Sequence, residues 1–263
     1  GGESYVNGNL LGKDRVSPFP TRSIIKATSA SICFFDVEAK FHPDRNFDKI
    51  SYEVNNMWFK FKNGNIGLRN INMAEREGQL IGIMGASGAG KTTLLNVLCG
   101  NEKPSDGSVL INGRNLHTEP EKLEGVIGLI PQDDLLIEEL TVYENLYYSA
   151  KLCFKHKSEA EIKELVDRTL DNLGLYERKD LVVGSPLNKS ISGGQRKRLN
   201  IALELIREPA VLFVDEPTSG LSSGDSENVI NLLRELAVKN GKLIFVVIHQ
   251  PSSDIYKMFD KMF

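Results

Sequence analysis

The sequence contains little cysteine and no long apolar run. Its three cysteines, Cys33, Cys99 and Cys153, lie far apart and form no CxxC pair. This pattern excludes a disulfide framework and a cysteine-based zinc site, and it fits a reducing compartment. The most apolar run, LIFVVI, covers only residues 243–248, whereas a membrane-spanning helix needs roughly 20 residues. We therefore expect no transmembrane helix in this chain, and no signal peptide is apparent.

An excess of charge of one sign is also missing. The 263 residues carry a net charge of −3, and 41% are hydrophobic and 25% charged, which is ordinary for a globular protein. Bulk electrostatics thus give no reason to expect nucleic acid as a partner. The length suits one large domain or a domain with an added segment. Because the chain begins with Gly-Gly and ends in YKMFDKMF, we expect it to be a piece of a longer chain.

The composition changes near residue 50. Residues 1–49 form an N-terminal extension whose first thirty residues are rich in Gly, Ser, Asn and Pro, which predicts extended or partly disordered structure. Residues 31–41 fit either a short strand or a helical turn. From residue 50 the pattern is regular: KISYEV and MWFKFK predict two strands, and Asn-Gly at 63–64 predicts a turn.

Short apolar runs, typical of buried parallel strands, recur between helical patterns. They lie at 80–84, 108–113, 126–130, 211–215 and 243–249. Two of the helices begin with a capping box, Thr141 with Glu144 and Ser158 with Glu161. Strands alternating with helices predict an α/β fold for residues 50–263. The stretch from about 133 to 190 reads as almost entirely helical, so we expect a separate helical lobe there.

The strongest motif is a glycine-rich phosphate loop. GASGAGKT, from Gly85 to Thr92, fits G-x-x-x-x-G-K-[ST], follows an apolar strand and opens a helix, which is the context that the motif requires. A glycine turn with an accidental lysine would not need both neighbours. Lys91 is expected to reach the β- and γ-phosphates, and the Thr92 hydroxyl to bind Mg²⁺. The residues expected to hold the nucleotide here are Gly85, Ala86, Ser87, Gly88, Ala89, Gly90, Lys91, Thr92 and Thr93.

Polar residues follow three further apolar strands. VLFVDEP ends in Asp215, a candidate Mg²⁺ ligand, and Glu216, a candidate group to polarise the attacking water. Alone, these would be solvated acids at a strand end, but the carboxyl edge of an α/β sheet is where ligands bind. Gln132 and His249 also follow apolar strands. An amide at Gln132 can touch both Mg²⁺ and water, and His249 can contact the γ-phosphate.

The order of these motifs resembles the nucleotide-binding domain of ABC transporters, over about 54–263. The resemblance implies a P-loop NTPase fold with an antiparallel β subdomain and a helical subdomain, with ATP and Mg²⁺ as ligands. It also identifies ISGGQ at 191–195 as the signature. An aromatic residue is expected to stack on adenine about thirty positions before Lys91. Phe61 matches that place, Phe59 is a second candidate, and ordinary sheet packing is the alternative for either.

The signature is a second anion site without a lysine. Ser192 can cap the helix that follows, whose N-terminus carries partial positive charge. By resemblance, this site closes on ATP bound to a partner domain, so a head-to-tail dimer encloses two nucleotides. The residues expected to act in trans are Ser192, Gly193, Gly194 and Gln195. The following RKR run either adds positive potential or forms a solvated helix face.

Finer similarities point to the G, or white/pigment, subfamily: LTVYENLYYSA, SISGGQRKRLNIALELI, DEPTSGL and HQPSSDIYKMFDK. That subfamily places the ATPase domain before a membrane domain on one chain, at the cytoplasmic face of the membrane. A second nucleotide-binding domain, in a homodimer, and the membrane domain are therefore the expected partners, with contact through the helical lobe near DDLLIEEL. Ile191 replaces the more common Leu. Ser222 stands where the family's D-loop has Asp, and Asp225 is expected in the next helix.

Three functions remain open at this point, and the sequence favours a transport ATPase. A soluble ABC ATPase acting on DNA or ribosomes is the second. Only 101 positions separate Lys91 from Ser192, without the sustained heptads of an inserted coiled coil, and one cassette is apparent instead of two. A binding-only regulatory cassette is the third. Intact Glu216 argues against it, and Ser222 leaves it open.

Overall fold

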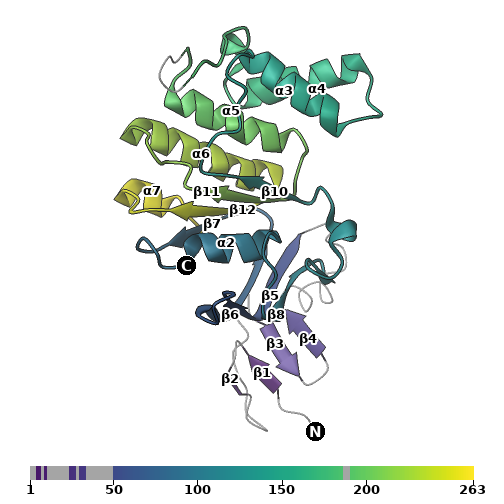
Figure 1. The fold of residues 1–263 in the computed structure, drawn as a ribbon, viewed down its shortest axis with the longest axis vertical. Helices are drawn as coiled ribbons and strands as arrows, with labels where there is room; N and C mark the ends of the chain where they lie inside the picture. The colour runs from purple at the N-terminus through teal and green to yellow at the C-terminus, as the bar shows by residue number, and fades with distance from the viewer. Residues whose placement is uncertain (1–3, 7–8, 11–23, 28–29, 34–49, 186–189) are drawn as a thin grey trace. The chain divides into compact units, whose positions relative to one another are not determined.

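The computed structural model describes residues 4–6, 9–10, 24–27, 30–33, 50–185 and 190–263 (Figure 1). The chain divides into two compact units, residues 1–77 with 96–124 and residues 78–95 with 125–263. In the first unit, the N-terminal extension contributes a four-stranded antiparallel sheet in the order β2-β1-β3-β4. These strands are β1 (Ser4–Val6), β2 (Asn9–Leu10), β3 (Ile24–Ala27) and β4 (Ala30–Cys33). The open assignment at 31–41 is thus a strand as far as Cys33, and its remainder lies outside the described residues.

The first unit also contains the antiparallel sheet expected from the resemblance, in the order β6-β5-β8-β9. Its strands are β5 (Ser51–Lys60), β6 (Ile66–Arg76), β8 (Asp106–Ile111) and β9 (Arg114–Asn115). The two predicted strands from KISYEV and MWFKFK are one strand, β5, which runs from Ser51 to Lys60. The expectation of a buried parallel strand at 108–113 is wrong, because β8 pairs antiparallel with β5. A short apolar run looks the same in either kind of sheet.

The second unit is built on a five-stranded sheet in the order β10-β11-β12-β7-β13, in which every neighbouring pair is parallel. The strands are β7 (Gln79–Met84), β10 (Ile127–Ile130), β11 (Val211–Asp215), β12 (Leu243–Ile248) and β13 (Lys261–Met262). All residues of β12 are buried. The rings of Phe213 and Phe245 stack with centroids 5.0 Å apart. Four of these strands were predicted as apolar runs, whereas β13 was not.

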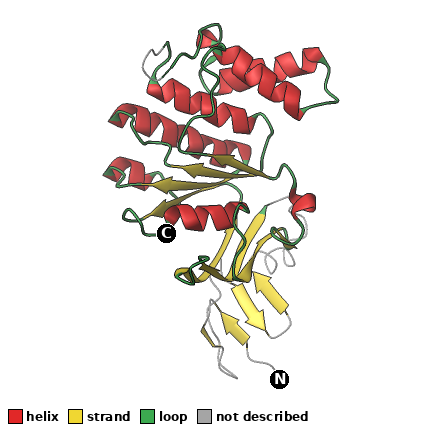
Figure 2. Cartoon of the chain, in the orientation of Figure 1, coloured by secondary structure: helices red, strands yellow, loops and turns green. Residues whose placement is uncertain are grey.

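Helices cover this sheet, as the red and yellow elements in Figure 2 show. Helix α5 (Gly193–Leu205) contacts β10, and α6 (Ser223–Asn240) contacts β7 and β12. Helix α2 (Lys91–Cys99) begins just after β7 and lies on the other side of the sheet from α6 in Figure 1. The short helix α7 (Ser253–Lys257) contacts α6. Together these elements form the α/β core that the sequence predicts.

Helices α3 (Val142–Cys153) and α4 (Glu159–Asn172) pack against each other and against α5. Both predicted capping boxes are present, with Thr141 and Ser158 as the N-cap residues. Between 133 and 185 the described residues are less helical than expected, because residues 133–140 form a loop and η2 (Tyr176–Arg178) is only a short 3₁₀ turn. The bounds of the helical lobe stay a prediction. Among the described residues, no helix has the length and apolarity needed to cross a bilayer.

Candidate nucleotide-binding site

The predicted site residues of the second unit follow the carboxyl ends of adjacent parallel strands. Ile130, the last residue of β10, pairs with Val214 of β11, and Ile248 of β12 pairs with Met84 of β7. The residues that follow therefore share one edge of the sheet: Gln132, Asp215, Glu216, His249 and the loop from Gly85. This is the edge at which open α/β sheets bind ligands. The strand register thus brings together motifs that lie up to about 160 residues apart in the chain.

The phosphate loop joins β7 directly to α2. Gly88 and Gly90 have φ angles of 78° and 91°, a region that glycine adopts without the steric cost of a Cβ. Lys91 is buried, and its Nζ donates to the carbonyls of Gly85 and Ala86 at 2.9 and 3.0 Å. Its two hydrogen-bond partners are neutral carbonyls, so an anion in this loop would be stabilised by the lysine charge. Thr92 is exposed at the start of α2, whose N-terminus also favours anions.

Asp215 ends β11 with one carboxylate oxygen, Oδ1, buried and without a hydrogen-bond partner among the described residues. Burial raises the pKa of its carboxyl above the ordinary value, and the charge of Glu216 raises it further. The positive charges of Lys91, His249 and Lys197 act in the opposite direction. A partly buried carboxylate with an unpartnered oxygen fits a divalent cation. The described residues contain no cluster of three or more His, Cys, Asp or Glu able to hold a metal, but Mg²⁺ bound with nucleotide needs only one or two carboxylates and phosphate oxygens.

Glu216 and His249 form a pair across the ends of β11 and β12. Nε2 of His249 lies 2.8 Å from Oε1 of Glu216. The Glu216 backbone has φ of 45°, a left-handed conformation that is uncommon for residues other than glycine and often found at functional sites. Its N–H donates to the carbonyl of Val247 at 3.1 Å. The pair combines a carboxylate that can accept a proton with an imidazole that can contact an anion.

The signature begins helix α5 as predicted. Ser192 is the N-cap residue, and its hydroxyl accepts from the N–H of Gln195 at 3.2 Å. The Gln195 side chain accepts from the N–H of Ser192 at 2.8 Å, so the capping box is complete. Ser192 itself is exposed. The structure thus presents the helix N-terminus at the surface of the second unit.

Ser222 and Asp225, where the sequence departs from the family's D-loop, lie beside the N-terminus of α5. Ser222 caps α6, its hydroxyl donates to Oδ2 of Asp225 at 3.0 Å, and Asp225 is in the first turn of α6, as expected. A Cβ added at Gly194 would lie 2.7 Å from Oδ1 of Asp225. A side chain at position 194 would therefore displace the Asp225 carboxylate from its present position. An acidic group does lie next to the signature, but it is Asp225, three residues after the position of the family's D-loop aspartate.

The two candidate adenine-stacking residues belong to the first unit and differ in exposure. The side chain of Phe61 is 44% exposed, whereas Phe59 is only 8% exposed. Their rings meet edge to face with centroids 5.3 Å apart. Of the two, Phe61 is the more accessible candidate for stacking on a base.

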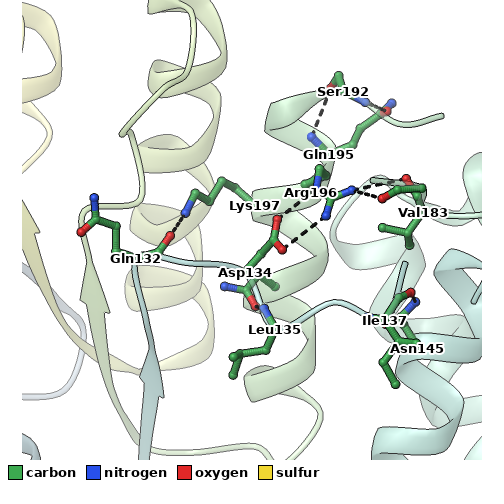
Figure 3. A network of polar contacts seen from close by, with 12 residues as sticks. Gln132, Asp134, Leu135, Ile137, Asn145, Val183, Ser192, Gln195, Arg196 and Lys197 are labelled. Atoms are coloured by element: carbon green, nitrogen blue, oxygen red, sulfur yellow. Dashed lines mark hydrogen bonds and ion pairs between the residues drawn. The ribbon is translucent and has the colours of Figure 1, made fainter. Parts of the chain in front are cut away.

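A polar network that the sequence did not predict holds the segment after Gln132 against α5 (Figure 3). Arg196 is buried, and its Nε and Nη2 donate to the two oxygens of Asp134 at 2.9 and 3.3 Å. Its Nη1 donates to the carbonyl of Gly184 at 2.5 Å. The solvated-face interpretation of RKR is therefore wrong for Arg196. The sequence hints at this ion pair only through its charges: two aspartates follow Gln132, and a basic run follows the signature.

Two asparagines complete this network. Buried Asn145 accepts from the N–H of Ile137 at 2.8 Å and donates to the carbonyls of Ile137 and Thr141, each at 3.0 Å. Oδ1 of Asn200 on α5 accepts from the N–H of Leu135 at 3.2 Å. These bonds give the backbone N–H groups of Leu135 and Ile137 hydrogen-bond partners and hold the loop in place. The side chains of Leu135 and Ile137 remain 64% and 52% exposed.

The Arg196–Asp134 pair should contribute measurably to stability. We expect Asp134→Ala to lower the free energy of unfolding by about 2 kcal/mol, because the buried guanidinium loses its counter-charge. Glu235→Ala is the control: it removes an exposed pair with Lys239 at 3.0 Å, whose contribution should be below about 0.5 kcal/mol. Urea denaturation of both variants measures the difference. Equal, small losses would contradict the proposed importance of the buried pair.

The glycine-rich loop between a parallel strand and a helix, with acids at the same sheet edge, defines a phosphate-loop nucleotide-binding domain. The family model described as ABC transporter matches residues 68–219, more than half of the chain. The chain therefore belongs to the ABC transporter family. A solved structure of cbiO1 from Clostridium perfringens, part of the ABC transporter complex cbiONQ, is 31% identical and superposes with a TM-score of 0.69 over 76% of this chain and 78% of that one.

Relatives of known sequence include members of the G family. ABC transporter G family member 25 of Oryza sativa subsp. japonica is 42% identical over 70% of this chain and 18% of its own length. ABC-type transporter claG of Penicillium crustosum is 41% identical over 71% of this chain and 25% of its own length. The chain thus spans a quarter or less of these relatives. The resemblance to the G subfamily is confirmed.

Proposed function

We propose that this chain is the ATP-binding and ATP-hydrolysing domain of an ABC transporter, acting as a head-to-tail dimer at the cytoplasmic face of a membrane. The observation that carries the proposal is the common sheet edge shared by Lys91, Asp215 and the Glu216–His249 pair at 2.8 Å. It supplies a phosphate cradle, a partly buried carboxylate and a proton acceptor in one place. Phosphoryl transfer needs little more than such positioning and charge stabilisation.

Within one chain, the loop from Gly85 to Thr93 binds the phosphates through its backbone N–H groups, and Lys91 exchanges its carbonyl partners for phosphate oxygens. Phe61 offers its exposed ring to adenine. Glu216 orients water and accepts its proton, while His249 holds the carboxylate and contacts the γ-phosphate. Lys91, Glu216 and His249 already lie at the carboxyl edge of the parallel sheet, and Phe61 is exposed just after β5.

The unpartnered buried oxygen of Asp215 supports binding of Mg²⁺. Thr92 and Gln132 would be its other protein ligands. When bound, Mg²⁺ neutralises charge on the phosphates. The raised pKa of Asp215, caused first by burial, is consistent with a carboxylate whose negative charge needs a cation.

The second chain completes each site. The exposed N-terminus of α5, with Ser192, Gly193, Gly194 and Gln195, suits the γ-phosphate of ATP bound to a partner chain. Hydrolysis removes that anion and weakens the dimer. Asp225 beside Gly194 supplies an acidic group three residues after the expected D-loop position. The Glu216–His249 pair favours hydrolysis over the alternative of a binding-only cassette.

The parent chain would couple dimer closure and opening to transport through its membrane domain. The exposed side chains of Leu135 and Ile137 lie on a loop pinned by Asn145 and Asn200. A hydrogen-bonded loop next to Gln132 that exposes two large apolar side chains suits contact with that domain. A transport assay of the parent chain in sealed vesicles, with and without ATP, tests this part of the proposal.

The test of the enzymatic proposal is ATP hydrolysis by the purified chain over a range of protein concentrations. We expect the rate per chain to rise with concentration, because two chains complete each site. Hydrolysis that is independent of concentration would contradict the dimer. Nucleotide binding without hydrolysis at any concentration would favour the binding-only cassette.

A further inference from the structure

Helix α5 carries three successive cations, and each donates to a main-chain carbonyl from a different part of the second unit. Arg196 binds the carbonyl of Gly184 at 2.5 Å, and Arg198 binds that of Leu173 at 3.2 Å. Lys197 donates through Nζ to the carbonyl of Gln132. Figure 3 shows the Gln132 carbonyl facing Lys197, with the Gln132 side-chain amide directed away from it. Of the three cations, Lys197 contacts the sheet edge that carries the candidate nucleotide site.

The charges around Lys197 link it to that edge. Burial lowers the pKa of its ammonium, and four carboxylates act in the opposite direction: Asp134, Asp133, Asp215 and Glu216. In turn, Lys197 is one of the three cations that lower the pKa of Asp215. A residue of the signature helix is therefore part of the charge balance around the proposed Mg²⁺ ligand of the same chain.

Two consequences follow from this placement. The bond to the Gln132 carbonyl fixes the backbone that carries the Gln132 amide. The ammonium, held on the Gln132 carbonyl, also repels a divalent cation approaching Asp215, because its positive charge already acts on that carboxylate. The first effect favours turnover, and the second weakens metal binding.

We propose that Lys197 is a positioning residue for the nucleotide site of its own chain, which orients Gln132 through its main-chain carbonyl and moderates the attraction of the acidic edge for Mg²⁺. This inference rests on the proposed function. Lys197 lies on the same helix as the signature residue Ser192, five positions after it, and the signature is proposed to serve the partner site. Lys197 thereby links the nucleotide site of its own chain to the signature, which is proposed to complete the nucleotide site of the partner chain.

Three substitutions separate the two effects. Lys197→Met removes both the donor and the charge, Lys197→Gln keeps a donor for the Gln132 carbonyl but loses the charge, and Lys197→Arg keeps both. Arg198→Met is the matched control, because Arg198 also donates to a carbonyl from α5 but not to that of Gln132. Thermal melting shows whether each variant is folded.

Electron paramagnetic resonance measures Mn²⁺ binding in the presence of a non-hydrolysable ATP analogue, and so tests the proposed effect of Lys197 on metal affinity. We expect Lys197→Met and Lys197→Gln to bind Mn²⁺ about three to ten times more tightly than the wild type, because a nearby positive charge is gone. Turnover should fall about tenfold in Lys197→Met and much less in Lys197→Gln or Lys197→Arg. A purely structural lysine would not tighten metal binding.

The inference is overturned if Lys197→Met and Arg198→Met have the same Mn²⁺ affinity and the same turnover. It is also overturned if Lys197→Met binds Mn²⁺ more weakly than the wild type. A wild-type chain that binds Mn²⁺ and nucleotide but never hydrolyses ATP would contradict the proposed function instead. In that case the metal measurements still decide the role of Lys197.

Discussion

Replacing Glu216 by glutamine is expected to abolish nearly all ATP turnover while leaving ATP binding intact. Glutamine has almost the same shape, and its amide can still hydrogen-bond His249, which lies 2.8 Å from the carboxylate in the native chain. It cannot accept a proton from water, and loss of a positioned general base typically costs about 10²- to 10⁴-fold in rate. Since the phosphate loop holds the nucleotide, the dimer closed on ATP should persist longer than in the wild type.

Two measurements test this expectation: single-turnover hydrolysis, and the lifetime of the ATP-bound dimer followed by size-exclusion chromatography. Glu208→Gln is the control, because Glu208 is also a left-handed residue, with φ of 55°, but its carboxylate forms an exposed ion pair with Arg168 at 3.4 Å and does not belong to the proposed site. It should hydrolyse ATP at the wild-type rate. Full hydrolysis by Glu216→Gln would exclude Glu216 as the base.

The sequence could predict the groups at the sheet edge because their positions depend on local rules. A buried strand has a recognisable apolar run, and whatever follows it lies at the carboxyl edge. Asp215 and His249 could therefore be assigned to one edge without knowledge of the strand order. The N-cap role of Ser192 depends only on residues within the same turn, and the structure contains it.

The network around Arg196 could not be predicted in the same way. Arg196 and Asp134 are separated by 62 positions, and their meeting depends on how α5 packs next to β10. The sequence alone allowed a solvated RKR face, because charge patterning describes one helix and not its neighbours. Strand β8 was misassigned for a related reason, since only its partner β5 determines that it is antiparallel.

Introducing arginine at position 192 should abolish turnover by a different route. Ser192→Arg removes the cap of α5 and places a long side chain at the exposed N-terminus that is proposed to meet the partner's ATP. Loss of an N-cap costs only about 1 kcal/mol, so the chain should still fold. The phosphate loop is unchanged, and a fluorescent ATP analogue should bind the monomer with wild-type affinity. Loss of that binding would contradict action in trans.

The structure offers a matched control for the cap itself. Ser158 begins α4 with the same kind of capping box, completed by Glu161. Ser158→Arg should lower stability about as much as Ser192→Arg, as measured by urea denaturation, but leave turnover nearly unchanged. A similar loss of activity in both variants would mean that general destabilisation, and not the signature turn, limits hydrolysis.

Mixing two inactive variants distinguishes action in trans from action in cis most directly. Lys91→Ala lacks a functional phosphate loop, and Ser192→Arg lacks a functional signature. If each site combines the loop of one chain with the signature of the other, a mixed dimer contains one site with both defects and one intact site. An equimolar mixture should then recover up to about a quarter of the wild-type activity for random pairing and independent sites. If loop and signature act within one chain, no intact site can form, and the mixture should remain as inactive as its two components.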